Sequence, residues 1–164
     1  MDSGLKIRHL ASGDPALNEV AALLGDLYRC LARLGSPVRL KPDGAMLWQR
    51  SIEKTLGRVH WVAIGLTHDS VVGFVHAHLR IPAGYYEGRS VGVIDHLYIC
   101  PEYRQMGIGT RLVDEARRWF VSHATETVEL QVVQGNREAM AFWRRAGFEI
   151  ELTQMRMNLR VSCQ

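Results

Sequence analysis

The sequence predicts a single α/β domain of the α+β type, in which a mixed, mostly antiparallel sheet packs against about four helices. Two apolar runs rich in β-branched residues, 59–66 and 71–79, are separated by four polar residues and therefore predict an antiparallel hairpin. A strand, a helix and a second strand follow one another across residues 91–133, which predicts a central parallel pair joined by a right-handed crossover. The 164 residues suffice for one buried core, so we expect residues 1–164 to form one domain.

The first half of the chain begins with a short strand candidate and two helical patterns. Asp14 precedes Pro15, which suits a helix cap followed by proline in the first turn, and Gly35 ends the helical spacing of apolar residues. After the hairpin, Pro82 and nearby glycines predict a loop at 81–90. The expected elements before this loop are a strand at 5–10, a helix at 17–34, a weaker helix at 45–56, and hairpin strands at 59–66 and 71–79.

In the second half, strands and helices alternate. Pro101 ends the first strand of this half, and Gly147 closes the last helix. The expected elements are a strand at 91–99, a helix at 107–123, a strand at 128–133, a helix at 136–146, and two final strands at 148–152 and 155–161.

The composition is that of an ordinary globular protein. The formal net charge is +3 and the basic residues are scattered, which argues against nucleic-acid binding. Cys30, Cys100 and Cys163 are far apart and fit neither a disulfide framework nor metal-ligand spacing. No apolar run has the length of a signal peptide or a bilayer span, so we expect a cytoplasmic protein without a membrane partner.

The stretch between the strand at 91–99 and the following helix predicts a phosphate-binding turn. A helix N-terminus offers unpaired N–H groups and a partial positive charge, and Gly107 and Gly109 let a pyrophosphate approach them. Arg104 adds a fixed charge and Thr110 a hydroxyl donor. A dinucleotide fingerprint would need a third glycine where Leu112 stands, and a P-loop would need a lysine that this stretch lacks.

Two motifs in sequence carry a family resemblance. Arg-x-x-Gly-x-Gly at 104–109 follows a strand ending in Tyr-Ile-x-Pro-Glu-Tyr, and this resembles motif A of the GNAT superfamily of N-acetyltransferases. The stretch 136–148, Asn-Arg-Glu-Ala-Met-Ala-Phe-Trp-Arg-Arg-Ala-Gly-Phe, looks like that family's motif B. The resemblance covers residues 91–160 closely and residues 5–80 only in the order of elements. It implies transfer of an acetyl group from acetyl-coenzyme A to a primary amine of a small molecule or peptide.

The resemblance also implies where the cosubstrate binds. In the family, the strands before and after motif A splay apart, and the pantetheine arm lies between them. Asn136, at the start of the last predicted helix, is expected to contact coenzyme A as well, although it could equally serve only as the cap of that helix. The cofactor-binding residues implied in this way are Leu97, Tyr98 and Ile99 for pantetheine, Arg104, Gln105, Met106, Gly107, Ile108, Gly109 and Thr110 for the pyrophosphate, and Asn136 and Trp143.

The chemistry needs a base for an ammonium substrate and a proton for the leaving thiolate. The resemblance places Asp95 where relatives carry an acidic or histidine base. His96 has a more suitable intrinsic pKa of about 6.5 but should point to the opposite face of the sheet, unless a local bulge reverses that choice. Trp143 stands where many members have a tyrosine acid. Because an indole does not release its proton, we expect water to protonate the thiolate.

Other residues invite less specific interpretations. Tyr28, Tyr85, Tyr86 and Glu87 are candidates for contacts with the acceptor. His76 and His78 share one side of a strand with His60 across the hairpin, and we expect them to line the acceptor cleft, because no spacing supports a metal site. Cys100 is expected to be an ordinary small residue. Two other functions remain open: an acetyl-coenzyme A sensor without catalysis, and a module that forms a homodimer through its C-terminal strands. A longer acyl group is also compatible with the motifs.

Overall fold

The structure, a computed structural model, describes residues 4–85, 87–88, 90–157 and 159. These residues contain a five-stranded sheet in the spatial order β1-β2-β3-β4-β5. Neighbouring strands are antiparallel except β4 and β5, which are parallel. The predicted mixed, mostly antiparallel sheet is thus confirmed. The strands are β1 (Lys6–His9), β2 (His60–Thr67), β3 (Ser70–Arg80), β4 (Val91–Ile99) and β5 (Thr127–Leu130).

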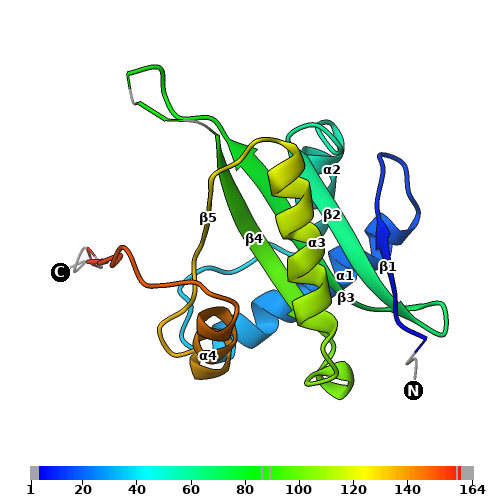
Figure 1. Cartoon of the computed structure of the whole chain (residues 1–164). Coiled ribbons are helices and arrows are strands. Elements are labelled where there is room, and N and C mark those ends of the chain that lie inside the picture. Colours follow the sequence, from blue (N-terminus) through cyan, green and yellow to red (C-terminus); the bar gives the residue numbers. More distant parts are fainter. Residues whose placement is uncertain (1–3, 86, 89, 158, 160–164) are drawn as a thin grey trace.

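Helices cover both faces of the sheet (Figure 1). One core lies between the sheet and α3, with Leu112 and Phe120 fully or almost fully buried, and α4 contributes to it. The other core lies between the sheet and the pair α1 and α2, with Leu17 and Leu24 fully buried. The four α-helices of the described residues lie close to their predicted bounds: α1 (Ala16–Arg33), α2 (Gly44–Glu53), α3 (Ile108–Ser122) and α4 (Arg137–Arg145).

The hairpin between β2 and β3 is confirmed. Its turn residues His68 and Asp69 have φ angles of 49° and 61°. Positive φ at both central residues gives a turn whose twist matches that of the flanking strands. The turn and a one-residue register shift between Gly65 and Leu66 together place His60 opposite His78.

A β-bulge interrupts β4. His76 of β3 pairs with His96, and the next residue, Ala77, pairs with Ile94, so Asp95 is the extra residue in β4. The bulge changes which residues face each layer. Before it, Ile94 lies in the core beneath α3. Beyond it, Tyr98 lies in the core on the α1 side.

The two predicted C-terminal strands are not formed in the described part of the chain. Residues 148–157 have no strand pairing, and after α4 the chain runs away from the sheet (Figure 1). The alternation of apolar residues suggested strands, but an extended segment forms a strand only when a neighbour accepts its hydrogen bonds. Among the described residues, β5 is therefore an edge strand, and the parallel pair lies at the edge rather than the centre of their sheet. Beyond Phe148, which packs against the core, the exposed large apolar side chains at this end of the described chain are Ile150, Leu152, Met155, Met157 and Leu159.

Within the described residues, none of the helices has the length and apolar character that crossing a membrane requires.

Candidate active site

The 104–110 turn leads from β4 through a short 3₁₀ helix (Pro101–Tyr103) into α3. Gly107 occupies the cap position of α3 with a φ of 77°, a left-handed conformation that favours glycine. The amide of Arg111 donates to the Gly107 carbonyl at 3.1 Å and begins the helical pattern. The amides of the first turn before it are the ones that an α-helix leaves without intrahelical partners. The turn therefore has the backbone geometry of an anion-binding site.

Arg104 holds a positive charge beside this turn. Its Nε donates to the carbonyl of Ile99 at 3.1 Å, and its guanidinium lies 5.9 Å from the centre of the Tyr98 ring. These contacts tie the side chain to the end of β4. The cation is thus held at the end of β4, although the residue is exposed to solvent.

The ladder between β4 and β5 covers only part of β4. It runs from Val91 and Thr127 to Ile94 and Leu130. Among the described residues, no strand pairs with Leu97–Ile99 on the β5 side. The strands diverge where the bulge begins, which is the geometry expected of a splayed pair.

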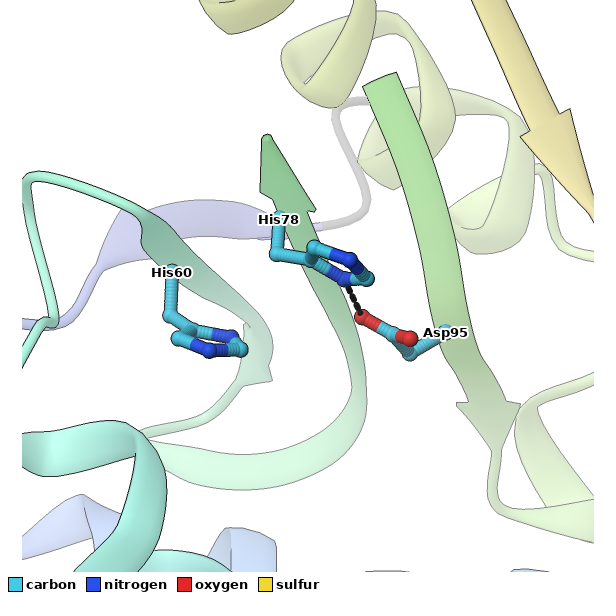
Figure 2. Close-up of side chains that lie close together, drawn as sticks. All are labelled: His60, His78 and Asp95. Atoms are coloured by element: carbon cyan, nitrogen blue, oxygen red, sulfur yellow. Dashed lines mark hydrogen bonds and ion pairs between the residues drawn. The ribbon is translucent and has the colours of Figure 1, made fainter. Parts of the chain in front are cut away.

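On the sheet face toward α1 and α2, six polar side chains form what we call the histidine cluster: Tyr28, His60, His76, His78, Asp95 and His96. His78 Nδ1 lies 2.6 Å from Asp95 Oδ2, an interaction drawn in Figure 2. His76 Nδ1 lies 3.5 Å from the same carboxylate oxygen. Asp95 thus faces histidines of β3 through its place in the bulge.

A second chain of contacts runs through the cluster. His60 Nδ1 is 2.9 Å from His76 Nε2, and His76 Nδ1 is 3.1 Å from His96 Nδ1. His96 Nε2 is 3.2 Å from the hydroxyl of Tyr28. The rings of His60, His76 and His96 are stacked, with centroids 5.1 and 5.3 Å apart along the series. Trp48 meets the rings of His76 and His96 edge-on.

Burial keeps much of this cluster neutral. It lowers the pKa of His76, which is only 3% exposed, well below the usual 6.5, and the neighbouring histidines add to the shift. Burial lowers the pKa of His96 to about 4, against the opposing effect of Asp95. The pKa of His60 is also lowered, mainly by burial. Burial, and to a lesser extent Asp95, raises the pKa of Tyr28. The buried imidazoles are therefore uncharged at neutral pH.

Two cavities adjoin the cluster. One of about 510 Å³ lies between α1 and the segment leading to α2, and Tyr28 contributes to its wall. The other, of about 250 Å³, lies where the β4–β5 ladder ends. Its lining residues are Arg80, Val93, Ile94, Asp95, Glu129, Leu130 and Gln131.

Comparison with known families bears on this arrangement. The model of the acetyltransferase (GNAT) family matches residues 25–148, well over half of the chain. The chain belongs to the GNAT family. This assignment confirms the predicted class of enzyme, an acyltransferase. The matched range includes the histidine cluster, the 104–110 turn and α4.

Individual relatives agree with the GNAT assignment. An N-acetyltransferase of Methanocaldococcus jannaschii, itself described as uncharacterised, is 36% identical over 63 residues; the match spans 38% of this chain and only 28% of that protein. An aminoglycoside acetyltransferase from an uncultured soil metagenomic sample, solved with trehalose, has a TM-score of 0.72 at 21% identity, covering 97% of this chain and 99% of that one. Aminoglycoside N-acetyltransferase AAC(6')-Iy, solved with coenzyme A, has a TM-score of 0.75 at 17% identity, covering 99% and 98%. At these identities the two structures demonstrate a shared fold.

In this GNAT-family chain, His96 does not follow the alternation of a regular strand. Alternation predicted the sheet face opposite Asp95 unless a local bulge intervened; the bulge is present, and both side chains contact His76. The alternation of a regular strand would separate consecutive residues, but the bulge at Asp95 adds one residue and brings both to the same face. The predicted cross-strand grouping of His60, His76 and His78 is present. Their convergence with Asp95 was missed because it depends on the bulge.

The motif B residues of the GNAT-family helix have clear structural roles. Asn136 caps α4, its side-chain oxygen accepting from the amide of Ala139 at 3.1 Å. Trp143 is only 8% exposed and meets Phe142 and Phe148 edge-on, at centroid distances of 5.0 and 5.2 Å. Contacts of Asn136 and Trp143 with coenzyme A stay predictions.

The remaining acceptor candidates differ in position. Tyr28 lies in the histidine cluster. Tyr85 is 83% exposed, on the loop after β3, which extends beyond the end of the sheet (Figure 1), and Glu87 is exposed on the same loop. Tyr86 lies outside the described residues. Burial raises the pKa of the Cys100 thiol, which disfavours a thiolate nucleophile there.

Proposed function

We propose that this protein transfers an acetyl group from acetyl-coenzyme A to a primary amine, by direct attack of the amine on the thioester in a ternary complex. The observation that carries the proposal is the position of Asp95. It lines the cavity at the end of the β4–β5 ladder, on the same strand that leads into the 104–110 turn. One continuous segment thus joins a carboxylate suited to an amine with a turn suited to a pyrophosphate.

The cosubstrate residues fit this proposal. The amides of Ile108, Gly109 and Thr110 and the cation of Arg104 would hold the pyrophosphate, with Gln105, Met106 and Gly107 shaping the turn. The open side of Leu97, Tyr98 and Ile99 would hold pantetheine through the backbone. Ile108 itself is buried, so its contribution is its amide. When bound, acetyl-coenzyme A supplies the activated acyl group.

The acceptor side would act through the histidine cluster. The Asp95 carboxylate would bind and orient the ammonium group and take its proton, directly or through water. His78, 2.6 Å from the carboxylate, would stabilise the charge and orientation of Asp95. His96 is the alternative base; its pKa of about 4 makes it neutral but weakly basic. Attack forms the C–N bond, the C–S bond breaks, and water protonates the thiolate, since Trp143 lacks a usable proton.

Electrostatics favour a cationic acceptor. Asp95 and Glu129 both line the cavity, and Arg80, the basic residue among the described residues of its lining, is paired with Glu129 at 2.5 Å. Because Arg80 neutralises Glu129, the Asp95 carboxylate is the acidic group of this cavity that would bind an ammonium group. Two structural neighbours are named as aminoglycoside acetyltransferases, and we extend only the class of cationic amine to this chain.

A screen of primary amines with acetyl-coenzyme A, read by release of free thiol, tests the proposal. We expect turnover with at least one cationic amine and little with neutral amines. Binding of acetyl-coenzyme A without turnover across polyamines, aminoglycosides, amino acids, arylalkylamines and peptide N-termini would instead support a sensor without catalysis.

A further inference from the structure

Three side chains of the histidine cluster form a set of metal ligands that no linear spacing in the sequence reveals. His60, His78 and Asp95 each present one ligand atom, and these three atoms lie within 4.8 Å of one another. Figure 2 shows the side chains converging from β2, β3 and β4 on a common space. The residues are separated along the chain by 17 positions or more, so the set is a product of the fold.

The backbone holds this arrangement in place. His60 and His78 are direct cross-strand partners in the β2–β3 ladder. Asp95 joins them because the bulge in β4 turns its side chain to the same face. All three positions lie on paired strands rather than on loops. Ligands carried by rigid strands lose little conformational freedom when they bind an ion.

The hydrogen bonds around His60 leave the right nitrogen for a metal. His60 Nδ1 lies 2.9 Å from Nε2 of the buried His76. An imidazole that binds a metal through Nε2 carries its proton on Nδ1 and donates it to a neighbouring acceptor. An unprotonated Nε2 of His76 can accept that proton, which leaves His60 Nε2 available to bind a metal. His76 would then take the outer-shell place that a carboxylate, a backbone carbonyl or water usually fills.

The donor set selects the class of ion. Two imidazoles and one carboxylate suit zinc and related divalent transition metals, whereas magnesium and calcium prefer oxygen ligands alone. In a tetrahedral zinc site with bonds of about 2.0–2.1 Å, ligand atoms are roughly 3.3 Å apart. The ligand atoms here lie within 4.8 Å of one another, and His78 Nδ1 and Asp95 Oδ2 are 2.6 Å apart, so an ion would bind with side-chain rotations that bring His60 nearer and open the His78–Asp95 contact. We propose that His60, His78 and Asp95 bind a divalent transition-metal ion of the zinc class, with one coordination position left for water or a substrate.

This proposal departs from the expectation of no metal, which rested on spacing along the sequence. The simpler interpretation is that Asp95 and His78 form only an ion pair, and His60 only a hydrogen bond to His76. The two interpretations differ in what His60 does. A metal site requires His60 and Asp95 together, whereas the ion pair does not involve His60. A bound ion would also occupy the Asp95 carboxylate, so metal and ammonium would compete; this consequence rests on the proposed function.

Calorimetric titration of the tag-free protein with Zn²⁺, and titration with Co²⁺ followed by visible absorption, test the site without acetyl-coenzyme A. We expect one ion per chain. His60→Gln, His78→Gln and Asp95→Asn should each weaken binding by more than the roughly 10–100-fold typical of outer-shell changes. Because no cosubstrate is present, the result is independent of whether the acetyl-transfer proposal holds.

His68→Asn is the matched control. It removes an imidazole from the hairpin turn and keeps a residue type that tolerates the left-handed conformation found there. Its zinc affinity should equal that of the parent. Absence of stoichiometric binding to the parent protein overturns the proposal. A folded His60→Gln variant that binds zinc as tightly as the parent also overturns it. If His60→Gln does not fold, the zinc affinity of Asp95→Asn, a nearly isosteric change, decides in the same way.

Discussion

The histidine cluster includes two residues from the middle of β4 and the 104–110 turn follows the end of that strand, but the two regions are built in different ways. The turn consists of consecutive residues, and its geometry depends on local backbone angles, such as the φ of 77° at Gly107. The cluster collects side chains from α1, β2, β3 and β4, and its contact between Tyr28 and His96 joins residues 68 positions apart. The turn offers backbone amides, and the cluster offers imidazoles and a carboxylate.

This difference teaches which kind of site a sequence reveals. A turn at a helix start needs particular residues at fixed spacing, so a motif marks it. A cluster across strands depends on register, and one extra residue changes its membership. The following predictions separate the two regions, because a change in one should leave the other intact.

The largest expected effect is on the turn. Gly109→Glu should weaken coenzyme A binding by at least about 100-fold, because it adds a bulky anionic group to the first turn of α3, whose amides are expected to bind the pyrophosphate. The increase in melting temperature on adding coenzyme A should disappear across a range of ligand concentrations.

Gly109→Ala is the control for that change. A Cβ at this position would lie 3.4 Å from the Phe142 ring, close to ordinary contact, so the alanine variant should keep the shift. Normal coenzyme A affinity in a folded Gly109→Glu protein would mean that the turn is not the pyrophosphate site.

The next effect belongs to the cluster alone. Asp95→Asn should reduce turnover by about 100-fold, in the range that removal of a general base produces, and leave the shift with coenzyme A unchanged. Steady-state rates with a saturating amine, measured beside the thermal shift, test both halves of this statement. If His96→Asn abolishes turnover and Asp95→Asn is silent, the base is the histidine.

The smallest effect is a pH dependence of stability that arises from the cluster. Burial lowers the pKa values of His76 and His96 below the 6.5 expected in the unfolded chain. At pH values between 6.5 and the lower pKa values of the folded protein, the unfolded state binds more protons than the folded state. The free energy of unfolding is therefore highest above pH 6.5 and decreases as the pH falls toward 4. The loss is at most about 1.4 kcal/mol per histidine per pH unit. Urea unfolding at several pH values measures it.

His96→Gln removes one of these titrating groups and should flatten the dependence, whereas His68→Asn should leave it unchanged. A free energy of unfolding that stays constant from pH 7 to pH 5 contradicts this account of the buried imidazoles.

Most of the fold was predictable because its signals are local. Pro15 and Gly35 mark the ends of α1, and the polar residues between β2 and β3 mark a turn. The two final strands predicted at 148–152 and 155–161 are not formed in the described residues, and residues 158, 160 and 161 lie outside them. Apolar residues do alternate at Ile150 and Leu152, but the described chain provides no strand that pairs with this segment. The pattern of a segment does not predict whether a neighbouring strand is available to it.

The candidate site likewise has parts that local sequence signals predict and parts that depend on strand pairing. The cap role of Asn136 and the left-handed glycine of the turn follow from residue type and spacing. The face on which His96 lies does not, because alternation is reliable only in an uninterrupted ladder. One signal was present in the sequence: two histidines of β3 were expected to lie across the hairpin from one histidine of β2. That signal alone did not indicate a metal site, because the third ligand, Asp95, joins the histidines only through the bulge.

The bulge in β4 also raises the density of functional groups on one surface. A regular strand shows every second residue to a given face, so its neighbouring side chains there are about 6.6 Å apart along the strand. At Asp95 and His96, two residues adjacent in sequence share a face. The extra residue of the bulge thus places two functional side chains where a regular strand would place one on that face. No further helix or strand is needed to supply the second side chain.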